Sequence, residues 1–162
     1  MSFIATASPL AAAAPSPAPA PSNIVTNDGF FPDIDLVRLR GAVRLDGTVT
    51  DQRLREAVVA AVISLNDEFA TWKAAQQLAG VASLSQLEPR IDGESRQLVL
   101  YLIAVHRTVR ADLTEKYRGF DATKSGRDQT EYVDQVADDE RGAVRRAVRA
   151  FLGLSNTTVE LI

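Results

Sequence analysis

A stripe of apolar side chains at helical spacing constrains the fold of this chain more than any other sequence feature. Its members recur every three or four residues: Leu54, Val58, Ala61, Val62, Leu65, Phe69 and Trp72. This spacing places all of them on one face of an α-helix. Thr50 or Asp51 can cap its start and Gly80 offers a left-handed stop, so one helix of about 40 Å is predicted to end near Ala79. A helix of that length in a small domain favours a bundle or an extended antiparallel hairpin.

A shorter helix is predicted ahead of this one. Pro32 suits a first-turn position, and Asp33 and Asp35 place negative charge at the positive end of a helix. The helix is predicted to end near Leu45, before the break at Asp46-Gly47. Its apolar face would be formed by Ile34, Val37, Leu39, Val43 and Leu45.

Two further helices are predicted in the second half of the chain. Asp92-Gly93-Glu94-Ser95 is read as the opening of one, which ends near residues 116–118, and a polar connector follows over 119–127. The last helix spans about Asp128 to Leu152. The predicted fold class is therefore all-α, a bundle of about four helices. The inward-facing positions would be Leu98, Leu102, Val105, Val109 and Leu113, then Tyr132, Val133, Val136, Val144, Val148 and Phe151.

The two ends of the chain differ from this helical region. Residues 1–26 are rich in alanine and proline, which predicts a flexible arm that is disordered or ordered only on binding. Its first 22 residues carry no Lys or Arg and proline interrupts any apolar core, which argues against a secretory signal. Residues 27–152 form the helical domain. Residues 153–162 form an extended tail whose last six residues are β-prone and able to add a strand to a partner.

The composition excludes several kinds of site. The chain has no cysteine, so disulfides, thiolate nucleophiles and cysteine-based metal sites are absent. His106 is the single histidine, and the residues three and four positions away offer it no catalytic partner, so a surface or interface role is expected. The net charge of −3 gives no general positive field for nucleic acid. No apolar run approaches the roughly 20 residues that cross a bilayer, so no membrane partner is expected.

Acidic residues cluster at three places: Asp33 with Asp35, Asp92 with Glu94, and Asp138 with Asp139 and Glu140. Carboxylate clusters can hold magnesium or calcium. The first two pairs, however, lie where predicted helix N-termini favour negative charge. The third group lies at short helical spacings from Arg141 and Arg145, so ion pairs within that helix are expected. No cofactor is expected.

The basic residues are mostly arginine, and four arginines fall within nine residues of the last predicted helix: Arg141, Arg145, Arg146 and Arg149. Arginine pairs bidentately with carboxylates and phosphates and is enriched at protein interfaces. Three interpretations stay open. The face binds an acidic protein surface, it lies near DNA without reading sequence, or it is a solvated helix face.

Four short strings, taken in order, add a resemblance. They are Phe30-Phe31-Pro32-Asp33-Ile34-Asp35, Arg53-Leu54-Arg55-Glu56-Ala57, Ile91-Asp92-Gly93-Glu94-Ser95 and Tyr117-Arg118-Gly119-Phe120-Asp121-Ala122. With these strings the chain resembles the head completion proteins of temperate contractile-tailed bacteriophages, mainly over residues 27–125. The resemblance implies a mostly helical, non-enzymatic adaptor that assembles as a ring, commonly a dodecamer, beneath the portal after DNA packaging. Such a ring retains the genome and presents a docking surface for neck and tail proteins.

The resemblance also implies roles for particular residues. The tail would grip the portal protein through Thr157, Thr158, Val159, Glu160, Leu161 and Ile162. The four arginines would meet a neighbouring copy or the portal, or face the DNA channel. The structural family motifs would comprise Phe30, Phe31, Pro32, Asp33, Asp92, Gly93, Glu94, Tyr117, Arg118, Gly119 and Asp121. Phe30 and Phe31 would form a staple closing the bundle or a contact between neighbours.

The resemblance implies a protein of the virion neck that is assembled in the host cytoplasm. Its partners would be the portal, copies of itself, tail or neck terminator proteins and, without specificity, packaged DNA. The sequence also leaves two other functions open. One is a helical regulatory module that grips a single protein partner, and the other is an enzyme that uses the carboxylates with magnesium.

Overall fold

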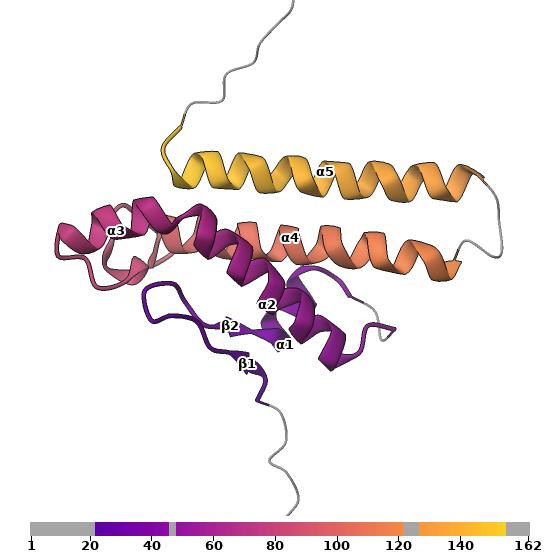
Figure 1. The fold of residues 1–162 in the computed structure, drawn as a ribbon, viewed down its shortest axis with the longest axis horizontal. Coiled ribbons are helices and arrows are strands. Elements are labelled where there is room, and N and C mark those ends of the chain that lie inside the picture. The colour runs from indigo at the N-terminus through magenta and orange to yellow at the C-terminus, as the bar shows by residue number, and fades with distance from the viewer. Residues whose placement is uncertain (1–21, 46–47, 122–126, 155–162) are drawn as a thin grey trace, which may run out of the picture.

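The computed structural model describes residues 22–45, 48–121 and 127–154 (Figure 1). Within these ranges the chain is mostly helical, and two small antiparallel strand pairs accompany the helices. The elements in chain order are β1 Ile24–Val25, β2 Ile34–Asp35, α1 Leu36–Ala42, α2 Asp51–Glu68, α3 Ala70–Leu78, a 3-10 helix η1 Leu84–Gln86, β3 Arg90–Ile91, β4 Glu94–Ser95, α4 Arg96–Asp121 and α5 Arg127–Phe151. The helices lie as a long antiparallel pair, α4 and α5, with α2 crossing α4 (Figure 1). The prevalence of helix confirms the helical part of the prediction, whereas the two small strand pairs were not predicted and the four-helix bundle is not confirmed.

The first helix begins later than its acidic residues predicted. Ile34 pairs with Val25 in the β1–β2 pair, so Pro32 precedes a strand and is not in a first helical turn. Asp35 caps α1, because its Oδ1 accepts from the backbone N–H of Val37 and Arg38 at 2.8 and 3.1 Å. The β1–β2 pair also brings residues 22–26 into the fold, although the sequence assigned them to the arm.

The long predicted helix is divided in two at Phe69. Phe69 departs from helical geometry with φ −91° and ψ 2°, although its N–H still donates to Leu65 O at 3.0 Å. Its fully buried ring stacks on Phe151, with 4.1 Å between the ring centroids. At this bend both Phe69 and Trp72 contact Phe151. The sequence had predicted a single straight helix without this bend. The apolar stripe is confirmed as core, and Gly80 has the left-handed φ of +85° expected of a helix stop.

The segment predicted to open the next helix is a β-hairpin instead. Arg90 pairs with Ser95 and Ile91 with Glu94, which leaves Asp92 and Gly93 as the two turn residues. Both have positive φ, 52° and 78°, as a two-residue type I′ turn requires. Asp92 and Glu94 are therefore exposed hairpin residues that precede α4 and do not form its first turn.

The two longest helices agree better with the sequence. α4 begins four residues later than predicted and continues to Asp121, while α5 matches its predicted range within one residue at each end. The predicted inward positions of α4 and α5 are buried at Val105, Val109, Leu113, Val148 and Phe151, and half-buried at Leu98, Leu102, Val136 and Val144. The side chains of Tyr132 and Val133 lie outside the described residues. None of the described helices is long and apolar enough to span a bilayer.

Six aromatic rings pack at the end of the molecule where the α2–α3 junction meets the last turn of α5. This aromatic cluster comprises Phe30, Phe31, Phe69, Trp72, Tyr101 and Phe151. Phe31 stacks on Tyr101 of α4, with 4.6 Å between the ring centroids. Trp72 meets Phe151 edge-on at the same separation. The cluster confirms that Phe69 is a core residue and that the half-buried Trp72 packs against the core, and it joins the loop before β2 to the α2–α3 junction, α3, α4 and α5.

Candidate functional site

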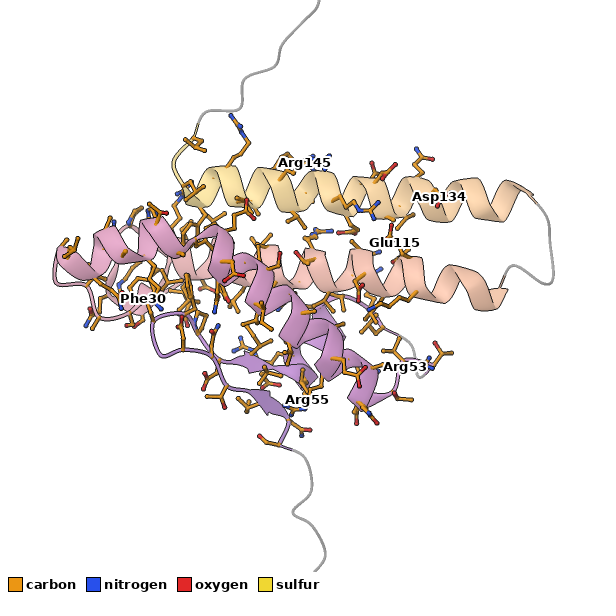
Figure 2. The ribbon with its side chains drawn as sticks, in the orientation of Figure 1. Phe30, Arg53, Arg55, Glu115, Asp134 and Arg145 are labelled. Carbon is orange, nitrogen blue, oxygen red and sulfur yellow. The ribbon has the colours of Figure 1, made fainter. Side chains whose placement is uncertain are left out.

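The arginine face, defined as Arg141, Arg145, Arg146 and Arg149, lies on the C-terminal half of α5. The first three of these side chains are exposed and the fourth is half-buried. Arg141 is ion-paired with Asp138 on its own helix at 3.3 Å and with Glu115 of α4. Figure 2 shows Glu115 between α4 and α5, and Arg145 toward the C-terminal end of α5.

A groove of about 310 Å³ lies between α4 and α5 beside the arginine face. Ala111 and Val144 contribute apolar surface to it. Charges of both signs border it, and the complete lining is Thr108, Ala111, Asp112, Glu115, Arg141, Val144 and Arg145. A groove with mixed charges and a small apolar surface suits the polar side chains of a protein partner better than a uniformly anionic polymer.

A buried carboxylate holds α5 against α4 close to this groove. The Glu140 side chain is only 7% exposed and accepts from Arg107 Nη1 at 2.9 and 3.1 Å. Arg110 Nη1 lies 3.3 Å from the same carboxylate. The sequence assigned Glu140 to ion pairs within its own helix, but its partners are both on α4. A charge on the helix face that also carries Ala137, Val144 and Val148 was the signal for a cross-helix partner.

A ring of three polar side chains lies beside the aromatic cluster. Tyr101 Oη donates to Asn66 Oδ1 at 2.7 Å, Asn66 Nδ2 donates to Asn27 Oδ1 at 2.8 Å, and Asn27 Nδ2 donates to Tyr101 Oη at 3.0 Å. Burial raises the pKa of Tyr101 to about 12, although the hydrogen bond from Asn27 acts in the opposite direction. The phenol therefore stays protonated at neutral pH and serves as a structural donor.

Asp28 and Lys73 form an ion pair next to the same cluster. Lys73 Nζ lies 2.6 Å from Asp28 Oδ2 and within 6 Å of the ring centroids of Phe30 and Phe31. Asp28 Oδ1 also accepts from the backbone N–H of Phe30 and Phe31 at 3.0 Å. Partial burial raises the pKa of Asp28, but these hydrogen bonds and the charge of Lys73 outweigh it, so the pKa lies below its ordinary 3.8.

His106 lies half-buried on α4 beside cationic groups. Burial lowers its pKa, and the positive charges of Arg38 and Arg107 lower it further. Within the described residues its ring makes no hydrogen bond and no ion pair, so the geometry offers it no partner for acid–base chemistry.

The motif residues predicted from the sequence fall into separate places. Phe30 and Phe31 are buried in the aromatic cluster, while Pro32 and Asp33 lie beside them, and Asp33 Oδ1 accepts from Asn27 N–H at 2.8 Å. The 3-10 helix η1 connects this motif to the β3–β4 hairpin, because Leu84 N–H donates to Phe30 O and η1 contacts β4.

The other predicted site residues lie on the last turns of α4 or outside the residues that the structure describes. Tyr117, Arg118, Gly119 and Asp121 belong to the last turns of α4, and their side chains lie outside the described residues. The predicted tail contacts, Thr157 to Ile162, also lie outside them. The described part of the chain contains no group of three or more acidic, histidine or cysteine side chains arranged to hold a metal ion.

Comparison with known proteins assigns the chain to a family. The model of the phage head completion protein (GPL) family matches residues 25–162. The head completion/stabilization protein of Escherichia phage P2 is 34% identical over 140 residues, which are 86% of this chain and 83% of that protein. No solved structure matches the chain. Because the family model spans most of its length, the chain belongs to the phage head completion protein family, whose members are structural proteins.

Proposed function

We infer that the chain is a structural protein of a phage virion that completes the head after DNA packaging. It acts as a ring adaptor between the portal and the tail or neck proteins, and it helps to retain the packaged genome. The observation that carries this proposal is the family match over residues 25–162, together with the similarity to a protein named for head completion and stabilization.

The arrangement of the surface supports a contact role. The arginine face and the groove beside it expose charges of both signs on the α4–α5 pair. Individual exposed ion pairs are weak, but a ring repeats each contact in every copy, so modest interfaces add up through avidity. In this proposal the arginine face meets a neighbouring copy, and the tail from Thr157 to Ile162 meets the portal.

The test uses DNA-filled heads that lack tails, incubated with the purified full-length protein. We expect the protein to pellet with the heads and to lower the fraction of packaged DNA that a nuclease can reach. A chain without residues 153–162 should lose most of its binding. Unchanged binding by that truncated chain would remove the tail from the proposal, and no association of the full chain with heads would refute the function.

A matched pair of variants tests the arginine face in the same assay. Arg145→Glu with Arg146→Glu should reduce head binding, because both side chains are exposed on that face. The control is Arg38→Glu with Arg44→Glu, which makes the same charge change at two exposed arginines in and just after α1. Equal losses in both variants would show that only the total charge matters.

A further inference from the structure

Two charged patches of opposite sign lie on the exposed side of α5. The acidic patch is Asp138 and Asp139, the basic patch is Arg145 and Arg146, and all four side chains are exposed. Glu140, which is buried against α4, lies on the opposite side of the helix. In Figure 1 α5 forms one edge of the molecule, with α4 next to it. The two patches therefore belong to a helix face that no other described part of the chain covers.

Gly142 lies midway between the two patches. The inner member of each patch is three positions from it along the chain, and the outer member is four positions from it. Residues three and four positions apart share one helix face, so both patches lie on the same face as Gly142. Along the helix this face carries two negative charges, a glycine and two positive charges. Reversing its direction exchanges the two patches and leaves Gly142 in place.

The charges of this face have few partners inside the chain. Within the described residues, the basic patch and Asp139 take part in no ion pair, and Asp138 has only the 3.3 Å contact with Arg141. The two patches cannot pair with each other, because their members are six to eight positions apart and ion pairs within a helix form at three or four. The guanidinium groups of the basic patch instead lie over Gly142, 3.3 and 3.8 Å from the position that its Cβ would take. These charges are available to an outside partner.

We propose that this face of α5 binds the same face of a second copy in an antiparallel, two-fold arrangement with Gly142 on the axis. The two-fold axis reverses the second α5, so the acidic patch of each copy faces the basic patch of the other. Asp138 lies at the same height along the axis as Arg146 of the second copy, and Arg145 of that copy is about 1.5 Å further along. The same holds for Asp139 with the order of the two arginines exchanged. Every close pair across the interface therefore joins opposite charges.

Other partners satisfy fewer of these charges. A parallel pairing in register places like charges against each other, and one displaced by seven residues leaves one patch of each copy unpaired. Packaged DNA is a poorer partner, because the acidic patch, about 10 Å from the basic patch along the helix, repels phosphates. The two-fold contact pairs both patches of both copies, and like patches of the two copies remain about 10 Å apart along the axis. Gly142 at the axis carries no side chain, so the two helix backbones can approach closely.

A two-fold contact joins identical faces and stops at a dimer. It therefore cannot be the contact that repeats around a ring, and it covers Arg145 and Arg146, which the ring adaptor proposed above presents to a neighbouring copy. The dimer is a form of the free protein that conceals part of the arginine face until the protein meets the head. Only this consequence rests on the proposed function, whereas the contact itself does not. Exposed ion pairs are weak and are screened by salt, so the dimer forms at high protein concentration and dissociates readily.

The first test exploits the absence of cysteine from the native chain. G142C places one thiol on the proposed axis. Q135C is the matched control, because residue 135 is exposed on the same face but lies about 10 Å from the axis, which separates its two copies by about 20 Å. Each variant and their equal mixture are oxidised at high protein concentration in low salt. We expect the G142C homodimer to form several-fold faster than the Q135C homodimer, and the difference to disappear in high salt.

The arginines beside residue 142 could also activate its thiol, so each rate is divided by the rate at which the same variant reacts with the neutral reagent dithiodipyridine. Equal corrected rates for the two homodimers would overturn the proposal, because an in-register parallel contact or random collision gives that result. A mixed disulfide that forms faster than the G142C homodimer would indicate a parallel, displaced contact and would also overturn it.

Charge exchange supplies a second measurement that keeps Gly142. Asp138→Arg/Asp139→Arg and Arg145→Asp/Arg146→Asp should each abolish the dimer in sedimentation velocity, and their equal mixture should restore it. The variant with all four changes keeps the native net charge and exchanges the two patches, so it should dimerise alone but not with the native chain. A native chain that stays monomeric in low salt, or a fourfold variant that does not dimerise, would overturn the proposal.

The concealment of the arginine face is tested with G142C and DNA-filled heads that lack tails. We expect the oxidised, disulfide-linked dimer to bind heads several-fold less than the same protein after reduction. Equal binding of the two forms would overturn the concealment. Head binding by a chain that forms no specific G142C disulfide would refute the dimer alone. A specific disulfide in a chain that binds no heads after reduction would refute the proposed function alone.

Discussion

The two ends of the α4–α5 pair are held together by different physics. At one end the aromatic cluster gathers rings from five segments of the chain into a neutral, buried core. Toward the other end α4 and α5 extend past α2 (Figure 1), and their contacts include the ion pairs of Glu140 and of Arg141. Phe69 is fully buried, whereas the side chains of Arg107 and Arg110 are 45% and 37% exposed. We refer to the second region as the ion-paired region.

This difference indicates which region of the molecule is rigid and which region responds to changes in salt. Aromatic burial involves no charges that salt could screen, and the Asp28–Lys73 pair links the cluster to acidic pH. Salt screens half-exposed ion pairs, and each such pair stabilises the fold by less than a buried pair does. The ion-paired region should therefore open before the aromatic cluster unfolds, and the surface proposed for partners lies next to it.

The strongest test of the aromatic cluster is Phe69→Ala. Removing a fully buried ring that stacks on Phe151 should lower the free energy of unfolding by about 3–5 kcal/mol. Urea denaturation followed by circular dichroism measures the loss. Leu78→Ala on α3 is the control, because that side chain is 91% exposed and should change the stability by less than about 0.5 kcal/mol. A similar loss in both variants would contradict the assignment of the core.

Glu140→Gln tests the ion-paired region and should have a smaller effect. The change leaves Arg107 and Arg110 without their buried counter-charge, and we expect a loss of about 2 kcal/mol because both arginines keep partial access to water. Amide hydrogen exchange should accelerate in the middle of α5 and remain slow around Phe69. Asp139→Asn, one residue away and exposed, is the control. Equal acceleration at both ends of the pair would show that they unfold as one unit.

Asp28→Asn tests how charge supports the aromatic end. The asparagine oxygen can still accept from the N–H groups of Phe30 and Phe31, so the charge interaction with Lys73 is what is lost. Because the pKa of Asp28 is lowered by folding, its charge stabilises the native state fully above the ordinary value of 3.8 and ceases to do so as the pH falls through the lower folded pKa.

We therefore expect Asp28→Asn to cost about 1 kcal/mol at neutral pH and to match the native chain in strong acid. Thermal melts over a range of acidic pH values measure this convergence. Asp67→Asn, an exposed site on α2, should show no such trend. A deficit in Asp28→Asn that stays constant with pH would rule out the charge as its cause.

Gly142→Ala is expected to have the smallest effect and the opposite sign. Alanine favours the helix by about 0.5–1 kcal/mol, but its Cβ would crowd Arg146 Nη1 at 3.3 Å, so a gain near the lower limit is expected. Gly41→Ala in α1 meets nothing within 4 Å and should gain at least as much. Differential scanning calorimetry compares the two melting temperatures. A larger gain at residue 142 would show that Arg145 and Arg146 do not lie over it.

Local periodicity was sufficient to predict much of the fold. The apolar stripe ending at Trp72 and the bounds of α5 follow from spacing within one helix, and the structure confirms both. The β3–β4 hairpin was missed because Asp92-Gly93 before a helical pattern fits either a helix start or a type I′ turn. Only the positive φ of both residues separates the two. The bend at Phe69 was missed because it depends on Phe151, which is distant in sequence.

The candidate site was less predictable for the same reason. The sequence located the arginine face, since four arginines in one helical segment are a local feature. It assigned Glu140 to its own helix, but Arg107, whose Nη1 donates to both Glu140 oxygens, is 33 residues away and belongs to α4. A charged side chain on a helix can pair with a residue of its own helix or with a residue of a neighbouring helix, and its burial decides which partner it takes. A 7%-exposed carboxylate must face the other helix to be paired.

The aromatic contact of Phe151 also has a mechanical consequence. Phe151 is the last residue of α5, and Gly153 turns the chain with a φ of +70° just before the described chain ends at Leu154. Arg96 of α4 also binds the C-terminal end of α5, since its Nη1 donates to Ala150 O at 3.3 Å. A tensile load applied at Leu154 therefore reaches, within three residues, a ring wedged against Phe69 and Trp72. The C-terminal end of α5 is therefore fixed to the core, and a force applied there is transmitted to the aromatic cluster.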